Sequence, residues 1–193
     1  MLNHTNSDGE SAFTDQKYLF KQTKKAGKNT MNGSFQIDKT DHKILEVLTS
    51  NARMLFLEVA RLCGISGAAV HQRVQKLMDA NIIKGSQFNL NPKGLGFQTC
   101  AFIGIQVNLQ ANTTHEQVFQ KIMKIHEIVE CHHISGKYSL FVKVFTKNNE
   151  HLKKVIVEYI QSIPEVTSTE TFISLEEGFT RNIPVNEGDI HSF

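Results

Sequence analysis

The chain has 193 residues, of which 40% are hydrophobic, so it can bury one sizeable core or two smaller ones. No stretch approaches about 18 consecutive apolar residues, and the N-terminus carries no apolar signal-peptide run. A membrane span and a secretory signal are therefore not expected. The three cysteines (Cys63, Cys100 and Cys131) are far apart and odd in number. This argues against a disulfide framework and favours a reducing, cytoplasmic location.

The net charge of +2 is unevenly distributed along the chain. Residues 1–36 hold five Lys and three acids, and residues 37–96 hold eight Lys or Arg and five acids. Residues 97–193 hold eight Lys or Arg but eleven acids. This distribution suits a first half that meets phosphates, joined to a second half that does not.

Residues 1–36 are polar and lack periodicity, and we interpret them as a disordered extension. One alternative is that translation starts at Met31, so that residues 1–30 are an over-extended gene prediction. The other is a basic arm that adds phosphate contacts through Lys17, Lys21, Lys24, Lys25 and Lys28. Residues 186–193 are expected to be a C-terminal tail.

Three short amphipathic helices are predicted next, over Lys39–Ser50, Leu55–Cys63 and Ser66–Ala80. Asp38 can cap the first, with Asp41 in the position of a capping-box acid. Ser66 is expected to cap the third helix, and Asn81 to end it because Asn tolerates the left-handed conformation.

The third helix separates its side chains into two faces. Val70, Val74 and Leu77 share one side, and polar residues point elsewhere. A helix, a tight turn with Gly and a second helix with a polar face outline a helix-turn-helix DNA reader. Two short β-like pieces, Ile82–Ser86 and Phe88–Leu90, are predicted to form a wing. Residues 91–96 read as a linker.

The second half changes period and predicts a β-α-β-β-α-β order. The strands are expected at 99–107, 129–135, 139–145 and 166–175, and the helices at 114–125 and 148–162. This is the ferredoxin-like arrangement, in which both helices cover one face of an antiparallel sheet. The other face must be covered, and a second copy of the sheet is the simplest cover. Dimerisation is therefore expected.

Four motifs in this order resemble the Lrp/AsnC (feast/famine) family of transcriptional regulators. They are IDKTDHKIL at 37–45, SGAAVHQRVQKL at 66–77, ECHHISGKYSL at 130–140 and FISLEE at 172–177. The resemblance spans about residues 37–185 and implies an α+β protein. An N-terminal winged helix-turn-helix domain with linker would cover 37–96, and a ferredoxin-like effector-binding and oligomerisation domain would cover 97–185. The resemblance also implies a homodimer or octamer, an amino-acid effector bound between regulation domains, and no other cofactor.

The resemblance places DNA contacts on the third helix. Gln can pair bidentately with adenine, Ala can contact a thymine methyl group, and Arg73 and Lys76 are expected to meet phosphates or a helix acid. The predicted DNA-binding residues are Ser66, Ala68, Ala69, His71, Gln72, Arg73, Gln75 and Lys76. The alternative is an ordinary solvated polar face.

The effector is expected at the turn between the second and third strands. Backbone N–H groups and Lys137 suit a carboxylate, and hydroxyls suit an amino group. The predicted effector-binding residues are Ile134, Ser135, Gly136, Lys137, Tyr138 and Ser139. Ser139 stands where the family often has an acid, which puts the amino-acid ligand in question. The alternatives are a plain hairpin turn and an orphan regulator that binds no small molecule.

Two further departures from the family pattern concern the helices. Met54-Leu55-Phe56-Leu57 stands where the second helix usually starts with a polar cap, and this apolar run is expected to make an intersubunit contact. Asn81 replaces the usual Gly, a mild change because both residues accept positive φ.

Other chemistries find little support in the sequence. His132 and His133 are adjacent on a predicted strand and point to opposite faces, so no metal site is predicted. No nucleophile–base pair, phosphate loop or carboxylate pair stands out, and the chain is not expected to be an enzyme. The rival functions are an enzyme built on the ferredoxin-like half and a ligand-sensing module whose helix-turn-helix binds protein.

Overall fold

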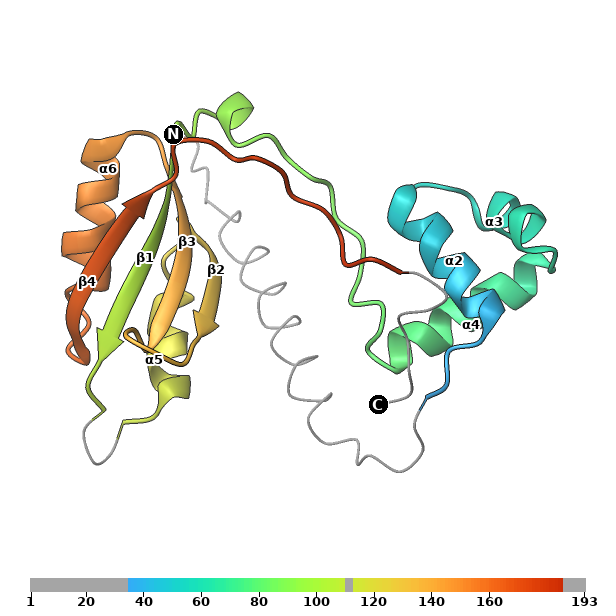
Figure 1. Ribbon diagram of the computed structural model, residues 1–193, viewed down its shortest axis with the longest axis horizontal. Coiled ribbons are helices and arrows are strands. Elements are labelled where there is room, and N and C mark those ends of the chain that lie inside the picture. The colour runs from blue at the N-terminus through green and yellow to red at the C-terminus, as the bar shows by residue number, and fades with distance from the viewer. Residues whose placement is uncertain (1–34, 110–112, 186–193) are drawn as a thin grey trace, which may run out of the picture. The chain divides into compact units, whose positions relative to one another are not determined.

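The computed structural model describes residues 35–109 and 113–185 (Figure 1). The chain forms two compact units. The first includes the chain up to Gln87 and again from Asn182, and the second spans Phe88–Arg181. The predicted extension, except for its last two residues, and the predicted tail at 186–193 lie outside the described residues.

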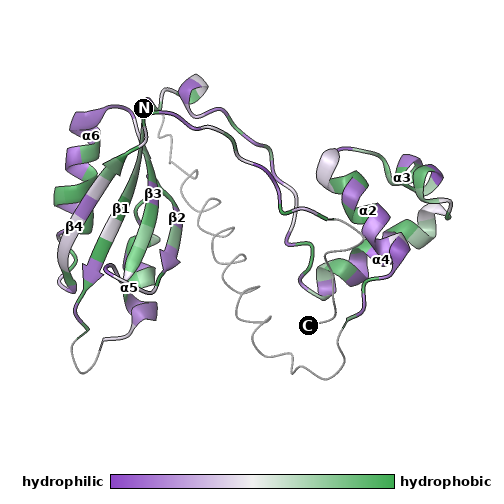
Figure 2. Ribbon diagram, in the orientation of Figure 1, coloured by the Kyte–Doolittle hydropathy of each residue, from purple (hydrophilic) through white to green (hydrophobic). Residues whose placement is uncertain are grey.

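The first unit is built on three helices, α2 (Lys39–Ser50), α3 (Phe56–Cys63) and α4 (Gly67–Asp79). These confirm the predicted helices to within one residue at each end. Their apolar sides meet in a small core of buried residues: Ile44, Val59, Ala60, Val70 and Val74. Figure 2 shows hydrophobic residues alternating with hydrophilic ones along each helix, as amphipathic helices require.

Local capping explains where these helices begin and end. The Asp38 side chain accepts from the backbone N–H of Asp41, and the Asp41 side chain accepts in return from that of Asp38, so the predicted capping box is confirmed. Ser66 Oγ accepts from Ala69 N at 3.1 Å at the start of α4. Asn81 has φ 58°, the left-handed conformation predicted for it. Leu55 is the N-cap of α3 and makes no side-chain capping hydrogen bond.

The two strands predicted for a wing are wrong. Residues 82–90 contain neither helix nor strand. Phe88 and Leu90 are 69% and 64% exposed, so this stretch buries little apolar surface. Gly85 has φ 146°, a conformation that interrupts regular strand geometry there.

The C-terminal segment of the described chain also belongs to the first unit. Residues 182–185 group with the helices, and Asn182 Nδ2 donates to the backbone carbonyl of Thr49 at 3.3 Å. Thr49 lies near the end of α2. The first unit is therefore built from two stretches of chain that are far apart in sequence.

The second unit holds a four-stranded antiparallel sheet in the order β2-β3-β1-β4. The strands are β1 (Thr99–Val107), β2 (Ile128–His133), β3 (Leu140–Thr146) and β4 (Val166–Ile173). The helices are α5 (His115–Ile122) and α6 (Asn149–Lys154), and η1 (Lys93–Leu95) is a short 3-10 turn before β1. This confirms the predicted ferredoxin-like βαββαβ fold (Figure 1).

The predicted helix at 148–162 is not uniform. α6 passes into a π-helix over Val155–Ile160, and Gln161 N donates to Ile156 O at 2.8 Å, a five-residue step. Val155 and Ile160 are both fully buried although they are five residues apart. The wider π turn brings them to one side, which an α-helix would not do.

The sheet has one covered face and one open face. Ile103, Ile105, Val142 and Val144 point towards α5 and α6 and are fully buried. Their neighbours along the strands point the other way, and Phe102, Phe141 and Phe172 form a contacting group of rings there. The alternation fixes which side chains a ligand or a second copy can reach.

Candidate DNA-binding surface and effector loop

The outer side of α4 carries most of the predicted DNA-binding residues. Val70, Val74 and Leu77 are buried, which turns the polar positions of the helix outwards. The exposed members are Ser66, Ala68, His71, Gln72, Gln75 and Lys76, whereas Ala69 and Arg73 are half-buried. The structure therefore brings six of the eight predicted residues onto one exposed surface.

Two of these side chains contact another side chain. The His71 ring meets the edge of the Phe56 ring from α3, with centroids 5.9 Å apart. Gln75 Nε2 donates to Asp79 Oδ1 at 3.0 Å along the same helix. A base-reading role for Gln75 would require that intrahelical bond to open.

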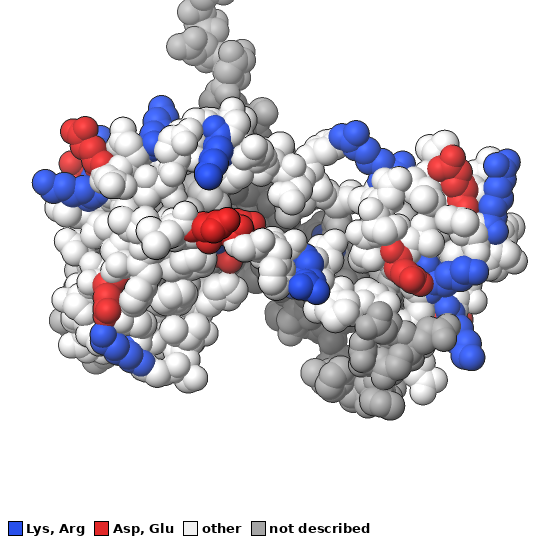
Figure 3. All heavy atoms as spheres, turned by 45° about the horizontal axis from the view of Figure 1, so that its top comes forward, with Lys and Arg blue, Asp and Glu red and all other residues white. Residues whose placement is uncertain are grey.

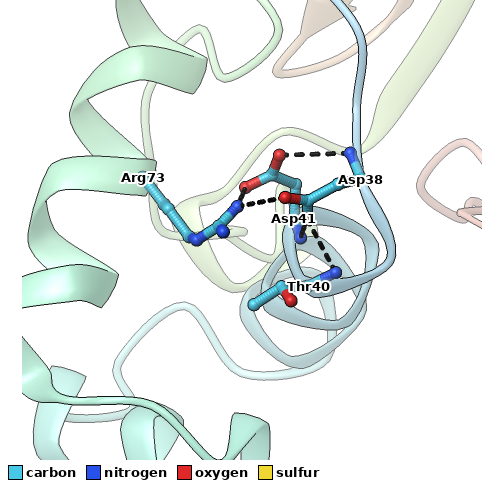
Figure 4. Close-up of polar contacts among 4 residues, drawn as sticks. All are labelled: Asp38, Thr40, Asp41 and Arg73. Carbon is cyan, nitrogen blue, oxygen red and sulfur yellow. Dashed lines mark hydrogen bonds and ion pairs between the residues drawn. The ribbon is translucent and has the colours of Figure 1, made fainter.

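Arg73 faces α2 instead of solvent (Figure 4). Its Nη1 donates to Asp38 Oδ2 and to Asp41 Oδ1, both at 2.7 Å. The Asp41 side chain is only 8% exposed. The backbone N–H of Asp41, and with it the Arg73 guanidinium, holds the pKa of Asp38 below its usual value. Of the two partners expected for Arg73, a phosphate or a helix acid, the structure provides the helix acids.

Charge on the surface is mixed. On the face drawn in Figure 3, Lys and Arg side chains are interspersed with Asp and Glu. They do not merge there into one basic patch.

The predicted effector loop, Ile134–Ser139, connects β2 to β3. Ile134 N donates to Ser139 O at 3.1 Å and closes the turn, and Gly136 has φ 127°. Ser139 also ties the loop to β1, because its N–H donates to Ile105 O at 2.9 Å and its hydroxyl accepts from Val107 N at 3.3 Å. Ser139 is thus a structural anchor of the loop.

Tyr138 lies flat against β1 at Gly104. A Cβ atom at Gly104 would come within 2.6 Å of the Tyr138 ring. The ring also contacts Phe141 and Phe172 on the open sheet face. Only glycine at position 104 allows this approach.

Glu170 on β4 contacts two of the predicted loop residues and was not itself predicted. Its Oε2 accepts from both Lys137 Nζ and the Tyr138 hydroxyl. The Lys137 ammonium, with help from Tyr138, holds the pKa of Glu170 below its usual value. Nearby, Gln106 Nε2 donates to Lys137 O at 3.0 Å and Ser168 Oγ donates to Gln106 Oε1 at 2.7 Å. A glycine within an apolar strand was the one sequence signal for this close approach.

The histidines of β2 do not form a metal centre with their neighbours. The His133 ring contacts the His115 ring at a tilt of 35° with centroids 4.1 Å apart, whereas His132 Nε2 lies 3.8 Å from Glu130 Oε2. Within 35–109 and 113–185, no group of three or more His, Cys, Asp or Glu side chains is placed to hold a metal ion.

Comparisons with known proteins agree with this architecture. The family model described as "Winged helix-turn-helix DNA-binding" matches residues 37–84, and the model described as "Lrp/AsnC ligand binding domain" matches residues 100–183. The regulatory protein AsnC of Haemophilus influenzae is 40% identical over 147 residues, which cover 76% of this chain and 97% of that protein. The chain belongs to the Lrp/AsnC family. It is a DNA-binding transcriptional regulator with a ligand-binding domain.

Other Lrp/AsnC proteins support the same alignment. AsnC of Escherichia coli K12 is 36% identical over 150 residues, covering 78% of this chain and 97% of that one. The solved structure of Escherichia coli AsnC superposes with a TM-score of 0.70 over 77% of this chain and 99% of that chain. The regulator NMB0573 of Neisseria meningitidis, solved as a complex with L-Met, has a TM-score of 0.72 at 24% identity, over 78% and 98% of the two chains. That likeness shows the fold alone.

In the part of this regulator that the structure describes, no helix is long and apolar enough to cross a membrane. The resemblance noted in the sequence is confirmed, and so is the regulator function that it implied.

Proposed function

We propose that this regulator reads duplex DNA through the exposed side of α4 and that an amino acid bound at the β2–β3 loop alters its DNA affinity. One observation carries the first part: Val70, Val74 and Leu77 are all buried, so the polar side of α4 is left available. The proposed reading residues are Ser66, Ala68, His71, Gln72, Gln75 and Lys76, with Ala69 at the edge.

Each of these side chains suits a different part of the duplex. Gln72 can pair bidentately with adenine, and the Ala68 methyl group can pack on a thymine methyl group. Lys76 is exposed and can neutralise a phosphate, which fixes register without reading sequence. Substitution of Gln72 should therefore relax sequence preference, whereas substitution of Lys76 should weaken all DNA binding alike.

A second copy of the chain is the proposed cover for the open sheet face. Phe102, Phe141 and Phe172 contact one another there, and Phe172 is 43% exposed. Apolar surface of this kind is a common basis for self-association. A homodimer presents two copies of α4, so DNA sites would be roughly palindromic. Octamers would form from such dimers.

The chemistry around the loop suits an α-amino acid. The Lys137 ammonium can receive a carboxylate, and the Glu170 carboxylate can receive an ammonium group. The Ile134–Ser139 backbone and the Tyr138 hydroxyl supply further polar groups. The L-Met complex of the Neisseria regulator is a precedent for such a ligand on this fold. Because Lys137 and Glu170 pair with each other, an orphan regulator that binds no small molecule is the second candidate.

Fluorescence anisotropy tests both parts. The probe is a labelled duplex that the wild-type chain selects from a random pool, compared with a scrambled duplex of equal composition and titrated with and without each amino acid. We expect the Gln72→Ala variant to lose most of the preference between the duplexes. Gln98→Ala, an exposed glutamine of the second unit, is the matched control and should keep the preference.

The two parts fail separately. If Gln72→Ala and the corresponding alanine variants of His71 and Gln75 all keep the wild-type preference, the reading surface is wrong. If the preference is normal but no amino acid changes it, the effector proposal is wrong and the orphan regulator replaces it.

A further inference from the structure

Arg73 is the one cation on α4 that faces the interior of the DNA-binding unit. We propose that Arg73 is a positioning residue for DNA recognition, which holds α4 against the N-terminus of α2 and does not contact phosphate. This inference rests on the proposed use of α4 as the reading helix. It gives a basic side chain in a DNA-reading helix a role that its charge alone would not suggest.

Position on the helix separates Arg73 from Lys76. Arg73 precedes the buried Val74, and its side chain is 32% exposed. Lys76 is exposed on the outer side. Arg73 reaches across to α2, and Figure 4 shows its guanidinium pointing at Asp38 and Asp41. One cation on α4 therefore faces α2, and the other faces solvent.

Every carboxylate oxygen of Asp38 and Asp41 accepts a hydrogen bond in this arrangement. Asp38 Oδ1 accepts from the N–H groups of Thr40 and Asp41 at 2.8 Å, and Asp41 Oδ2 accepts from Asp38 N at 3.2 Å. The remaining oxygens, Asp38 Oδ2 and Asp41 Oδ1, are the two that receive Arg73 Nη1. The guanidinium thus completes the capping box of α2.

Release of Arg73 towards a phosphate would carry a cost. Asp41, at 8% exposure, would be left as a nearly buried carboxylate without its charge partner, beside a second carboxylate. Removing one partner of a buried pair is much more unfavourable than removing an exposed one. The favoured state is therefore the clamped one, and DNA meets an α4 whose orientation α2 has already set.

Salt dependence separates a positioning residue from a phosphate contact. Each phosphate contact contributes about 0.9 to the slope of log affinity against log salt. We expect Arg73→Gln in the full chain to weaken binding of the selected duplex about three- to tenfold with an unchanged slope. The matched control Lys76→Gln should lower the slope by about 0.9 if Lys76 meets a phosphate.

The partner acid gives the sharper test. Asp41→Asn should weaken binding to a similar degree, although it removes a negative charge, and the Asp41→Asn/Arg73→Gln double variant should be no weaker than either single one. A phosphate contact predicts the reverse, namely equal or tighter binding for Asp41→Asn and a slope about 0.9 lower for Arg73→Gln. That result would overturn the proposal.

Folding controls keep the test decisive. Circular dichroism melts identify variants that are unfolded at the assay temperature. Asp38→Asn serves if Arg73→Gln is unfolded, because Asn is an equally good N-cap and keeps the α2 cap while removing charge facing Arg73. Weaker binding with an unchanged slope then supports the clamp, and unchanged or tighter binding refutes it. Wild-type duplex preference in all three alanine variants of His71, Gln72 and Gln75 would instead refute the reading helix itself.

Discussion

Single side chains of the effector loop are held by β4, which pairs with β1 and not with the strands that flank the loop. Lys137 and Tyr138 reach Glu170 because Gly104 leaves room above β1. The sequence named the two loop residues through local motif likeness. It could not name Glu170, since the partners lie more than 30 residues apart and meet only once the sheet order brings β4 beside β1. Arg73 was likewise placed on the correct helix, but its partners on α2 depended on packing.

The Glu170 contact should make stability depend on pH. Because Lys137, and with it Tyr138, lowers the pKa of Glu170, folding favours the carboxylate. The stabilisation is then present above the usual pKa of 4.5 and is lost as pH falls through the lowered value. We expect Glu170→Gln to have a slightly lower melting temperature than wild type at pH 7, and the difference to disappear in acid.

Thermal unfolding followed by circular dichroism between pH 7 and about 3 checks this. The control is Glu176→Gln, an exposed carboxylate that takes no part in the ion pairs of the described residues. A difference between Glu170→Gln and wild type that stays constant across this range would contradict the assignment.

At the scale of elements, periodicity and caps predicted every helix and every sheet strand. These signals are local, and Asp38 and Ser66 both cap the helices that they were expected to cap. The predictions of two wing strands and of a uniform last helix were wrong because both elements depend on which side chains become buried, and local periodicity does not show this. Residues 82–90 form no strand, and the packing of Val155 with Ile160 favours a π turn.

α3 offers a stabilising substitution. Leu55 occupies its N-cap with φ −65° and ψ 139°, is 67% exposed and provides no acceptor for the free N–H groups of the first turn. Leu55→Ser should raise the free energy of unfolding by about 0.5–2 kcal/mol, because Ser is a preferred N-cap. Urea denaturation measures the change.

Leu57→Ser is the matched control for this variant. Leu57 is 60% exposed on the same helix but lies inside it, so serine there removes a similar apolar surface without adding a cap. If both substitutions raise the free energy of unfolding, the increase comes from replacing an exposed apolar side chain and not from a new cap. Destabilisation by Leu55→Ser that grows with protein concentration would instead support the intersubunit contact predicted from the sequence.

At the scale of the whole molecule, the two faces of the sheet differ in what they can do. One is closed by α5 and α6, and the other presents a group of aromatic rings in which Phe102 and Phe141 stack with centroids 6.0 Å apart. The open face was expected from the strand order alone, because a ferredoxin-like sheet has helices on one side only. The composition of that face follows from strand alternation.

A charge on the open face should prevent self-association. We expect Phe172→Glu to sediment as a monomer at concentrations where wild type forms a dimer or a larger assembly, because the carboxylate would be buried at the interface. Val157→Glu, at a residue 50% exposed on the helix side, is the control and should assemble normally. Sedimentation velocity distinguishes the species. Normal assembly of Phe172→Glu would show that the interface does not lie on the open sheet face.

The DNA-binding unit takes its chain from two places, up to Gln87 and again from Asn182, with Asn182 bonded to the carbonyl of Thr49. The ligand-binding domain is therefore an insertion tethered at both ends. A domain joined by a single polypeptide segment can rotate about that segment without moving the unit to which it is joined. A domain joined by two segments has less freedom to rotate than a domain joined by one, because both connections must follow the same rotation.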